Sequence, residues 1–231
     1  MKQDAHEILI LTCEHASNKL PAAFRNAVPA GVLETHRAYD IGALAVFSKL
    51  VKFAKPEFYC EGKFSRLFVD LNRTITNKSA FSDYYKQLEV RDKNAAEKAK
   101  AQATKYWTEY RAAVEKFVAS SLSMPKRSSS KTRLAKTAPT IVHLGIHCFT
   151  PVLNGKKRNT DIGILYDPSC PAECKLAQVI KAEINRQHPE MKVRFNYPYK
   201  GTSDGLTTTL RKKFGPRYAG LEIEINQKFF L

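Results

Sequence analysis

The sequence predicts an α/β fold in which helices cover both faces of a mostly parallel (mixed) central sheet. Short apolar runs rich in β-branched residues alternate with longer segments of helical periodicity. The connections between successive strands are long enough to hold crossover helices. The 231 residues, 43% of them hydrophobic, are sufficient for a substantial core. We expect a single domain over residues 1–231, because no internal repeat or linker interrupts this pattern.

The first half of the chain is expected to contain two strands and a large helical content. A continuous apolar run at 8–12 is typical of a strand buried on both faces. Apolar side chains at helical spacing predict a helix over 33–54, which Pro56 closes. The β-rich stretch at 64–71 is expected to form the second strand. Residues 82–122 carry the longest helical pattern and are expected to form two helices or one bent helix.

The second half begins with a basic tract and then continues the alternation. Residues 125–137 are rich in Ser and Lys without apolar periodicity, which predicts a basic surface loop. The central strand is expected at 140–147. The remaining elements are expected to be strands at 161–166, 191–196 and 220–225, and a helix at 174–188.

The net positive charge favours anionic ligands but does not indicate which class of anionic ligand the protein binds. Lys and Arg number 38 against 22 Asp and Glu, a net charge of +16 that would attract nucleic acid, anionic membranes or anionic small molecules. The basic tract at 125–137 lacks interleaved aromatic residues for base stacking, so nucleic-acid binding is the weaker alternative.

We expect a cytoplasmic protein without a membrane span. No apolar run approaches the ~18 residues that a membrane helix needs. The N-terminal residues lack the features of a secretory signal. The five cysteines are an odd number in a chain that needs no disulfide framework, which indicates a reducing compartment. Cys170 and Cys174 lack a second pair at zinc-binding spacing and are expected to flank a helix start.

Polar residues gather where the predicted strands end. Ligands of such sheets bind beyond the carboxyl ends of the strands, so these side chains are expected to lie at one edge. They are Glu14 and His15 after the first strand, Asp70, Asn72 and Arg73 after the second, His147 on the central strand, and Glu222 and Glu224 on the last.

The combination of His and carboxylate side chains fits a zinc hydrolase. His36 and Asp40 lie four residues apart on one face of the predicted helix, so a third metal ligand can join His15 and His147. Three protein ligands leave a position open for water, and a carboxylate acts as the general base. Because Glu222 and Glu224 share one strand face, one of them is expected to be that base.

Two nearby residues have structural interpretations. His143 lies on the same strand face as His147 but deeper in the sheet, where a hydrogen-bonded core histidine is the better prediction. Glu14 either binds the metal or orients His15.

Seven sequence blocks resemble the N-formylglutamate amidohydrolase family, in family order and over nearly the whole chain. They are Thr12-Cys-Glu-His-Ala-Ser-Asn18-x-x-Pro21, His36-x-x-Tyr-Asp-Ile-Gly-Ala43, Ser65-Arg-Leu-x-Val-Asp-Leu-Asn-Arg73, Gly145-Ile-His-Cys-Phe-Thr-Pro151, Arg158 with Asp161-Ile-Gly-Ile-Leu-Tyr166, and Asn196-x-Pro-Tyr-x-Gly201, followed by the closing Gly220-Leu-Glu-Ile-Glu224. The resemblance implies the phosphorylase/hydrolase-like three-layer α/β/α sandwich that zinc carboxypeptidases and zinc muramoyl amidases share.

The resemblance also implies roles for individual residues. One zinc ion would activate the water that attacks an amide carbonyl, with Glu224 as the base. The metal ligands implied are His15, then His36 or Asp40, then His147.

Residues of the matching blocks suit an anionic amide substrate. Arg66, Arg73 and Arg158 suit a substrate carboxylate, Arg73 above all, since a guanidinium binds a carboxylate through two hydrogen bonds. Tyr199 is expected to donate a hydrogen bond to the oxyanion or the substrate, and Asn72 to organise the substrate-binding loop.

The sequence departs from the family pattern just after Glu224, at a position that bears on the identity of the substrate. Family members often continue the late glutamate as Glu-Ile-Arg-x-Asp, whereas Asn226 follows Ile225 here, which replaces a cation by an amide.

The resulting hypothesis is a zinc-dependent amidohydrolase that acts on an N-formyl or N-acyl amino acid. One alternative is a catalytically silent protein on the same fold that binds nucleic acid or another polyanion. Another is a peptide or muramoyl amidase or a carboxypeptidase, because these relatives share the metal geometry.

Overall fold

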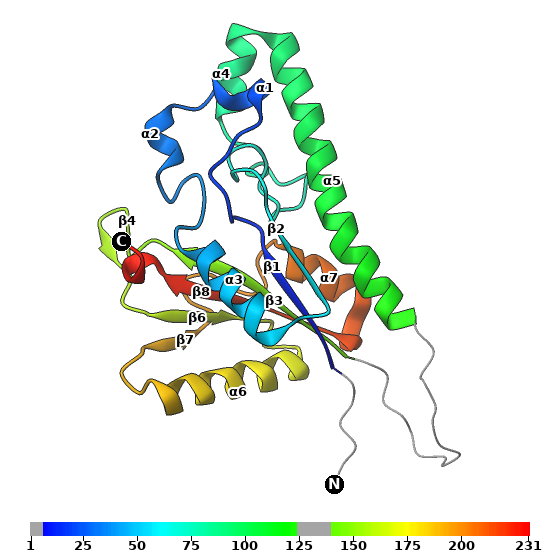
Figure 1. The fold of residues 1–231 in the computed structure, drawn as a ribbon, viewed down its shortest axis with the longest axis vertical. Helices are drawn as coiled ribbons and strands as arrows, with labels where there is room; N and C mark the ends of the chain where they lie inside the picture. Colours follow the sequence, from blue (N-terminus) through cyan, green and yellow to red (C-terminus); the bar gives the residue numbers. More distant parts are fainter. Residues whose placement is uncertain (1–6, 124–139) are drawn as a thin grey trace.

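A six-stranded sheet lies between two layers of helices in the computed structural model, which describes residues 7–123 and 140–231 (Figure 1). The strands are β1 (Glu7–Cys13), β2 (Phe58–Glu61), β3 (Thr140–Phe149), β6 (Ile162–Leu165), β7 (Val193–Phe195) and β8 (Tyr218–Asn226). Their order is β2-β1-β3-β8-β6-β7, and only the β8–β6 pair is antiparallel. A two-stranded hairpin, β4 (Val152–Leu153) with β5 (Lys156–Lys157), stands apart. The expected three-layer α/β/α sandwich with a mostly parallel mixed sheet is confirmed.

Helices cover the two faces of the sheet. They are α1 (Ala22–Arg25), α2 (Ala30–Leu33), α3 (Ala43–Ala54), α4 (Tyr84–Arg91), α5 (Lys93–Ser123), α6 (Pro171–Gln187) and α7 (Leu206–Phe214), with 3₁₀ turns at Gly215–Arg217 and Gln227–Phe229. Helices α3 and α6 pack on one face, where Ile223 contacts the apolar clusters of both. Helices α5 and α7 pack on the other face, where Val114 and Leu210 share a cluster with Ile10.

Strand register places the polar residues of β3 and β8 on a single face. His147 is paired with Glu224, and Gly145 with Glu222. Alternate residues of a strand point the same way, so these side chains lie on the face that α5 and α7 cover. The prediction that Glu222 and Glu224 share a face is confirmed.

The predicted strand at 64–71 is wrong. The second strand is β2, and residues 64–71 form an irregular segment that packs inside the molecule. Phe68, Val69 and Leu71 are each at most 1% exposed. These apolar side chains are therefore buried by an irregular loop that forms no strand of the sheet.

The predicted helix over 33–54 is also wrong in its first half. Helix α3 begins only at Ala43, directly after Gly42, whose φ of 89° is left-handed. A Cβ on Gly42 would lie 2.2 Å from the Phe230 ring, so only glycine fits there. His36 and Asp40 therefore lie on an irregular segment and share no helix face.

Most other elements follow the prediction. The tract over 82–122 forms two helices, α4 and α5. Cys170 is the N-cap residue of α6, so the two nearby cysteines do flank a helix start. Helix α7 and the β4–β5 hairpin were not predicted.

The predicted basic loop at 125–137 lies outside the described residues. None of the helices in the described ranges has the length and apolar character needed to cross a membrane.

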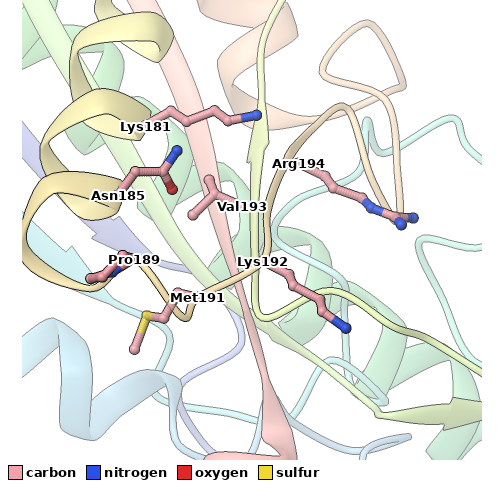
Figure 2. A pocket seen from close by; sticks show the side chains of 7 residues that line it. All are labelled: Lys181, Asn185, Pro189, Met191, Lys192, Val193 and Arg194. Carbon is pink, nitrogen blue, oxygen red and sulfur yellow. The ribbon is translucent and has the colours of Figure 1, made fainter.

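Cationic side chains surround β7, the strand at one edge of the sheet. Lys181, Lys192 and Arg194 line a shallow hollow of about 410 Å³ beside this strand (Figure 2). Within the described residues, none of the three forms an ion pair with a carboxylate. Positive side chains beside a free strand edge discourage pairing of that strand with other chains.

His143 is the buried core histidine that its position predicted. Its Nε2 lies 2.8 Å from Thr12 Oγ1, and its Nδ1 lies 2.5 Å from the Tyr218 hydroxyl. Burial lowers the pKa of His143 to about 4. The unfolded chain therefore takes up a proton near pH 6.5 that the folded chain accepts only near pH 4.

This difference predicts an acid-dependent loss of stability. As the pH falls from 6.5 to 4, the free energy of unfolding should drop by about 3 kcal/mol through His143, at ~1.4 kcal/mol for each unit of pKa difference. Denaturant unfolding over this pH range would measure the drop. The His143→Gln variant should show a curve flatter by that amount, and parallel curves for both proteins would contradict the prediction.

Candidate metal centre

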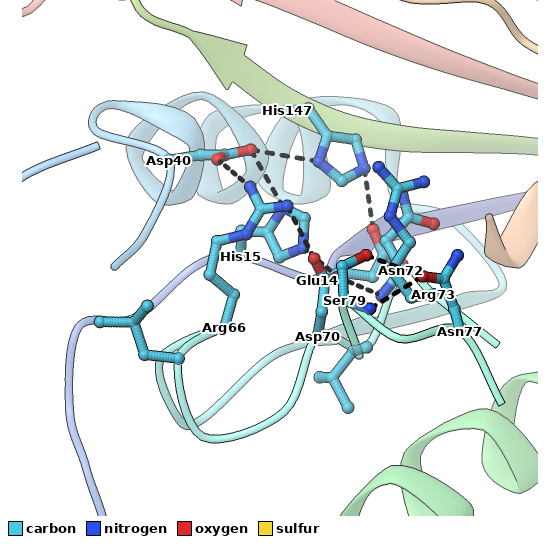
Figure 3. Close-up of polar contacts among 12 residues, drawn as sticks. Glu14, His15, Asp40, Arg66, Asp70, Asn72, Arg73, Asn77, Ser79 and His147 are labelled. Atoms are coloured by element: carbon cyan, nitrogen blue, oxygen red, sulfur yellow. Dashed lines mark hydrogen bonds and ion pairs between the residues drawn. The ribbon is translucent and has the colours of Figure 1, made fainter. Parts of the chain in front are cut away.

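Three buried side chains from separate parts of the chain converge beyond the sheet edge (Figure 3). His15 follows β1, His147 lies near the end of β3, and Asp40 precedes α3. Asp40 Oδ2 lies 3.4 Å from His15 Nδ1 and 3.1 Å from His147 Nδ1. The ligand atoms of the three residues all lie within 4.8 Å of one another.

Backbone contacts hold Asp40 in this position. The Asp40 N–H donates to the His15 carbonyl oxygen at 3.0 Å, and the Cys148 N–H donates to Asp40 Oδ2 at 3.2 Å. The segment before α3 is thus tied to the ends of both β1 and β3.

Each imidazole of the group also faces a second carboxylate. His15 Nε2 lies 2.8 Å from Asp70 Oδ1, and His147 Nε2 lies 3.1 Å from Glu14 Oε2. The Arg66 guanidinium contacts Asp70 at 2.7 Å and Asp40 at 3.5 Å. Carboxylates behind the ligating histidines are a recurrent feature of metal sites, where they fix the orientation of the ring.

Electrostatics explain how so many buried charges are tolerated. Burial alone would raise the pKa of Asp40, but the charge of His15 and the hydrogen bonds from both histidines hold it well below its usual range. Burial would also raise the pKa of Glu14, but His147 lowers it to about 2. Burial lowers the pKa of His147, but Asp40 and Glu14 raise it well above its usual value.

The donor set suits a divalent metal. Carboxylates that attract protons to two imidazoles attract a divalent cation for the same reason, and a metal ion would displace those protons. Two imidazole nitrogens and one carboxylate oxygen are a ligand set of catalytic zinc sites. His15, Asp40 and His147 therefore fit a metal ion.

The two glutamates of β8 differ in their contacts. Glu224 is buried, and its Oε2 has no hydrogen-bond partner among the described residues. Burial, together with the charges of Asp40 and Glu222, raises the pKa of Glu224 to about 7. Glu222 Oε1, by contrast, accepts hydrogen bonds from Asn72 Nδ2 and Thr207 Oγ1. The geometry therefore favours Glu224 as the proton acceptor.

A cavity of about 150 Å³ joins this group to the predicted substrate residues. The predicted site residues that line it are His15, Asp40, Arg66, Asn72, Arg73, His147, Tyr199, Glu222 and Glu224. The Arg73 guanidinium also donates a hydrogen bond to the Asp204 carbonyl oxygen.

The structure does not bring all the predicted site residues to the cavity. In the described part of the chain, neither Arg158 nor His36 is among the cavity-lining residues. Arg158 instead contacts the Tyr199 hydroxyl at 3.3 Å. His36 is exposed on the irregular segment before α3, so Asp40 is the member of that pair that meets the histidines.

Helix α5 supports the site with residues whose part the sequence did not indicate. The buried Arg111 guanidinium donates to the carbonyl oxygens of Leu71 and Arg73 at 3.0 and 3.3 Å. Trp107 Nε1 also donates to the Arg73 carbonyl oxygen, at 2.9 Å. One feature of the sequence could have indicated this role: Arg111 is a charged residue next to Tyr110 and near Val114, which lie on the apolar face of the helix.

Fold and site together define an α/β/α protein with a buried candidate metal centre. Beside it lies a glutamate, one of whose oxygens has no hydrogen-bond partner within residues 7–123 and 140–231. The family model for N-formylglutamate amidohydrolase matches residues 8–231, and the chain belongs to this family. Membership supports an amidohydrolase.

A solved structure has a similar fold. The gene product Atu2144 from Agrobacterium tumefaciens is 29% identical, with a TM-score of 0.70. The match covers 98% of this chain and 83% of that one. None of the curated proteins matches the chain.

Proposed function

We propose that the protein is a zinc-dependent amidohydrolase that cleaves the amide C–N bond of an N-formyl or N-acyl amino acid. The observation that carries the proposal is the unpartnered, buried Oε2 of Glu224 in the cavity that His15, Asp40 and His147 also line. Family membership supports the same reaction class.

The proposed chemistry divides between metal and protein. Zinc, held by His15, Asp40 and His147, would supply Lewis acidity toward the amide carbonyl and toward water. Glu224 takes a proton from the attacking water on its free carboxylate oxygen and returns it to the leaving nitrogen. Glu224 is buried, and its Oε2 has no hydrogen-bond partner among the described residues, so this oxygen is available to take up and return the proton.

Cationic and polar residues of the cavity orient the substrate. Arg73 is the proposed partner of the substrate carboxylate, and Tyr199 is the proposed hydrogen-bond donor to the substrate or the oxyanion. Arg66 already contacts Asp40 and Asp70, so its main effect is to hold the ligand Asp40 and the carboxylate behind His15 in place. Asn72 holds Glu222 through its side-chain amide.

Metal content and hydrolysis test the proposal together. Purified protein should contain close to one zinc per chain by elemental analysis, and the His15→Ala and His147→Ala variants should lose it. Hydrolysis of N-formylglutamate should stop with chelator and resume when zinc is added back.

Each other outcome has a defined meaning. Zinc without hydrolysis of N-formylglutamate would overturn that substrate and direct the search to other N-acyl amino acids and to peptides. A protein that takes up no zinc would overturn the proposal and favour the polyanion-binding alternative. Salt-dependent retention on heparin that is lost on deletion of residues 125–137 would then support that alternative.

A further inference from the structure

Helix α5 directs a buried tyrosine toward the back of the candidate metal centre. The Tyr110 hydroxyl lies 3.3 Å from Glu14 Oε1 and 3.4 Å from the Cys60 carbonyl oxygen. The residue is 8% exposed, so water does not replace these contacts freely. A buried hydroxyl held between two acceptors donates to one or the other, and the carboxylate is the stronger acceptor.

Glu14 connects this tyrosine to a proposed metal ligand. Its two oxygens have different neighbours. Oε1 faces the Tyr110 hydroxyl. Oε2 lies 3.1 Å from His147 Nε2, and Figure 3 shows Glu14 beside His147. Glu14 is only 2% exposed, so every donor it meets offsets the cost of burying its charge. Loss of the hydroxyl would remove the Tyr110 hydrogen bond to Oε1, leave His147 and Thr12 as the groups that stabilise the carboxylate, and make it easier for the carboxylate to turn.

We propose that Tyr110 is a positioning residue for the metal centre. It fixes the Glu14 carboxylate, whose Oε2 lies in ion-pair contact 3.1 Å from His147 Nε2, and this contact holds the His147 ring so that Nδ1 faces Asp40 at 3.1 Å. Residues behind metal ligands raise affinity by holding the ligand in its binding orientation before the metal arrives. This inference rests on the proposed function, because it assigns Tyr110 a part in zinc binding.

The same helix offers a matched control. Tyr106 lies one turn before Tyr110, and its hydroxyl accepts a hydrogen bond from the Lys63 N–H at 2.6 Å. Tyr106→Phe removes one tyrosine hydroxyl and one hydrogen bond from α5, as Tyr110→Phe does, without touching Glu14. A general structural effect would therefore appear in both variants.

Zinc dissociation constants measured by competition with a chromogenic chelator test the inference on the full chain. Tyr110→Phe should bind zinc about tenfold more weakly, and Glu14→Gln about 10–100-fold more weakly, the range for partners behind metal ligands. Tyr106→Phe should match the wild type. In the Glu14→Gln background, Tyr110→Phe should cause no further loss, because the tyrosine acts through Glu14. Thermal unfolding of the zinc-free proteins checks that each variant folds.

Three results would overturn the inference while the proposed function stands. These are unchanged affinity in Tyr110→Phe, an equal loss in Tyr106→Phe, and additive losses in the double variant. A wild-type protein that binds no zinc would overturn the proposed function and the inference with it. The zinc affinity of the wild type thus separates the two failures.

Discussion

Glu224→Gln is expected to lower kcat for amide hydrolysis by about 10²–10⁴-fold, the usual contribution of a general base. The amide keeps the shape of the carboxylate but cannot accept a proton. Zinc content and the circular dichroism spectrum should match the wild type, because Glu224 is not one of the three converging residues of the candidate metal centre. Steady-state kinetics with zinc-loaded proteins would measure the effect.

Glu222→Gln is the matched control on the same face of β8. Its Oε1 already accepts hydrogen bonds from Asn72 and Thr207, so the loss of charge there should reduce kcat much less. If Glu222→Gln were the more damaging change, Glu222 would be the base. Loss of both zinc and fold in Glu224→Gln would give Glu224 a structural role instead.

The fold could be predicted where hydrophobic burial and regular hydrogen bonding coincide. β1 and β3 are inner strands, and their continuous apolar runs are visible in the sequence. β2 is a four-residue edge strand with alternate exposure, so its pattern is weak. The segment 64–71 carried the stronger β pattern, but its apolar side chains are buried by an irregular loop. Periodicity reports burial and does not reveal which backbone conformation achieves it.

Helix α7 escaped prediction for a different reason. Thr207, Thr208 and Thr209 are consecutive, and β-branched side chains disfavour a helix on their own. Two of their hydroxyls bond to other elements: Thr207 Oγ1 donates to Glu222 Oε1 at 3.2 Å, and Thr209 Oγ1 accepts a hydrogen bond from the Arg111 guanidinium at 2.6 Å. Tertiary contacts therefore decide this helix.

The sequence indicated much of the candidate site because parallel strands deliver their carboxyl ends to one edge. His15, His147 and Glu224 could be placed together on that argument alone. The contact of Glu14 could not be predicted. The sequence left Glu14 as a metal ligand or as a partner of His15, whereas in the structure its carboxylate faces His147. The choice between His36 and Asp40 also stayed open, because both were assigned to a helix that does not exist there.

Asp40→Asn is expected to weaken zinc binding by more than about 100-fold, beyond the effect of changing a residue behind the ligands. The amide keeps the size of the side chain but removes the anionic oxygen between His15 Nδ1 and His147 Nδ1. His36→Asn should bind zinc as the wild type does, because His36 is exposed and lies outside the converging group. Zinc-to-protein ratios after dialysis, followed by chelator competition, would measure both effects.

Stability gives a second readout that does not depend on catalysis. A ligand that binds only the folded chain stabilises it by about 2.7 kcal/mol at a concentration 100 times its Kd. Zinc should therefore raise the Tm of the wild type and of His36→Asn but leave that of Asp40→Asn nearly unchanged. The reverse result, a zinc response that survives Asp40→Asn and disappears in His36→Asn, would make His36 the middle ligand. It would also require the segment before α3 to rearrange when the metal binds, since His36 is exposed in the structure described here.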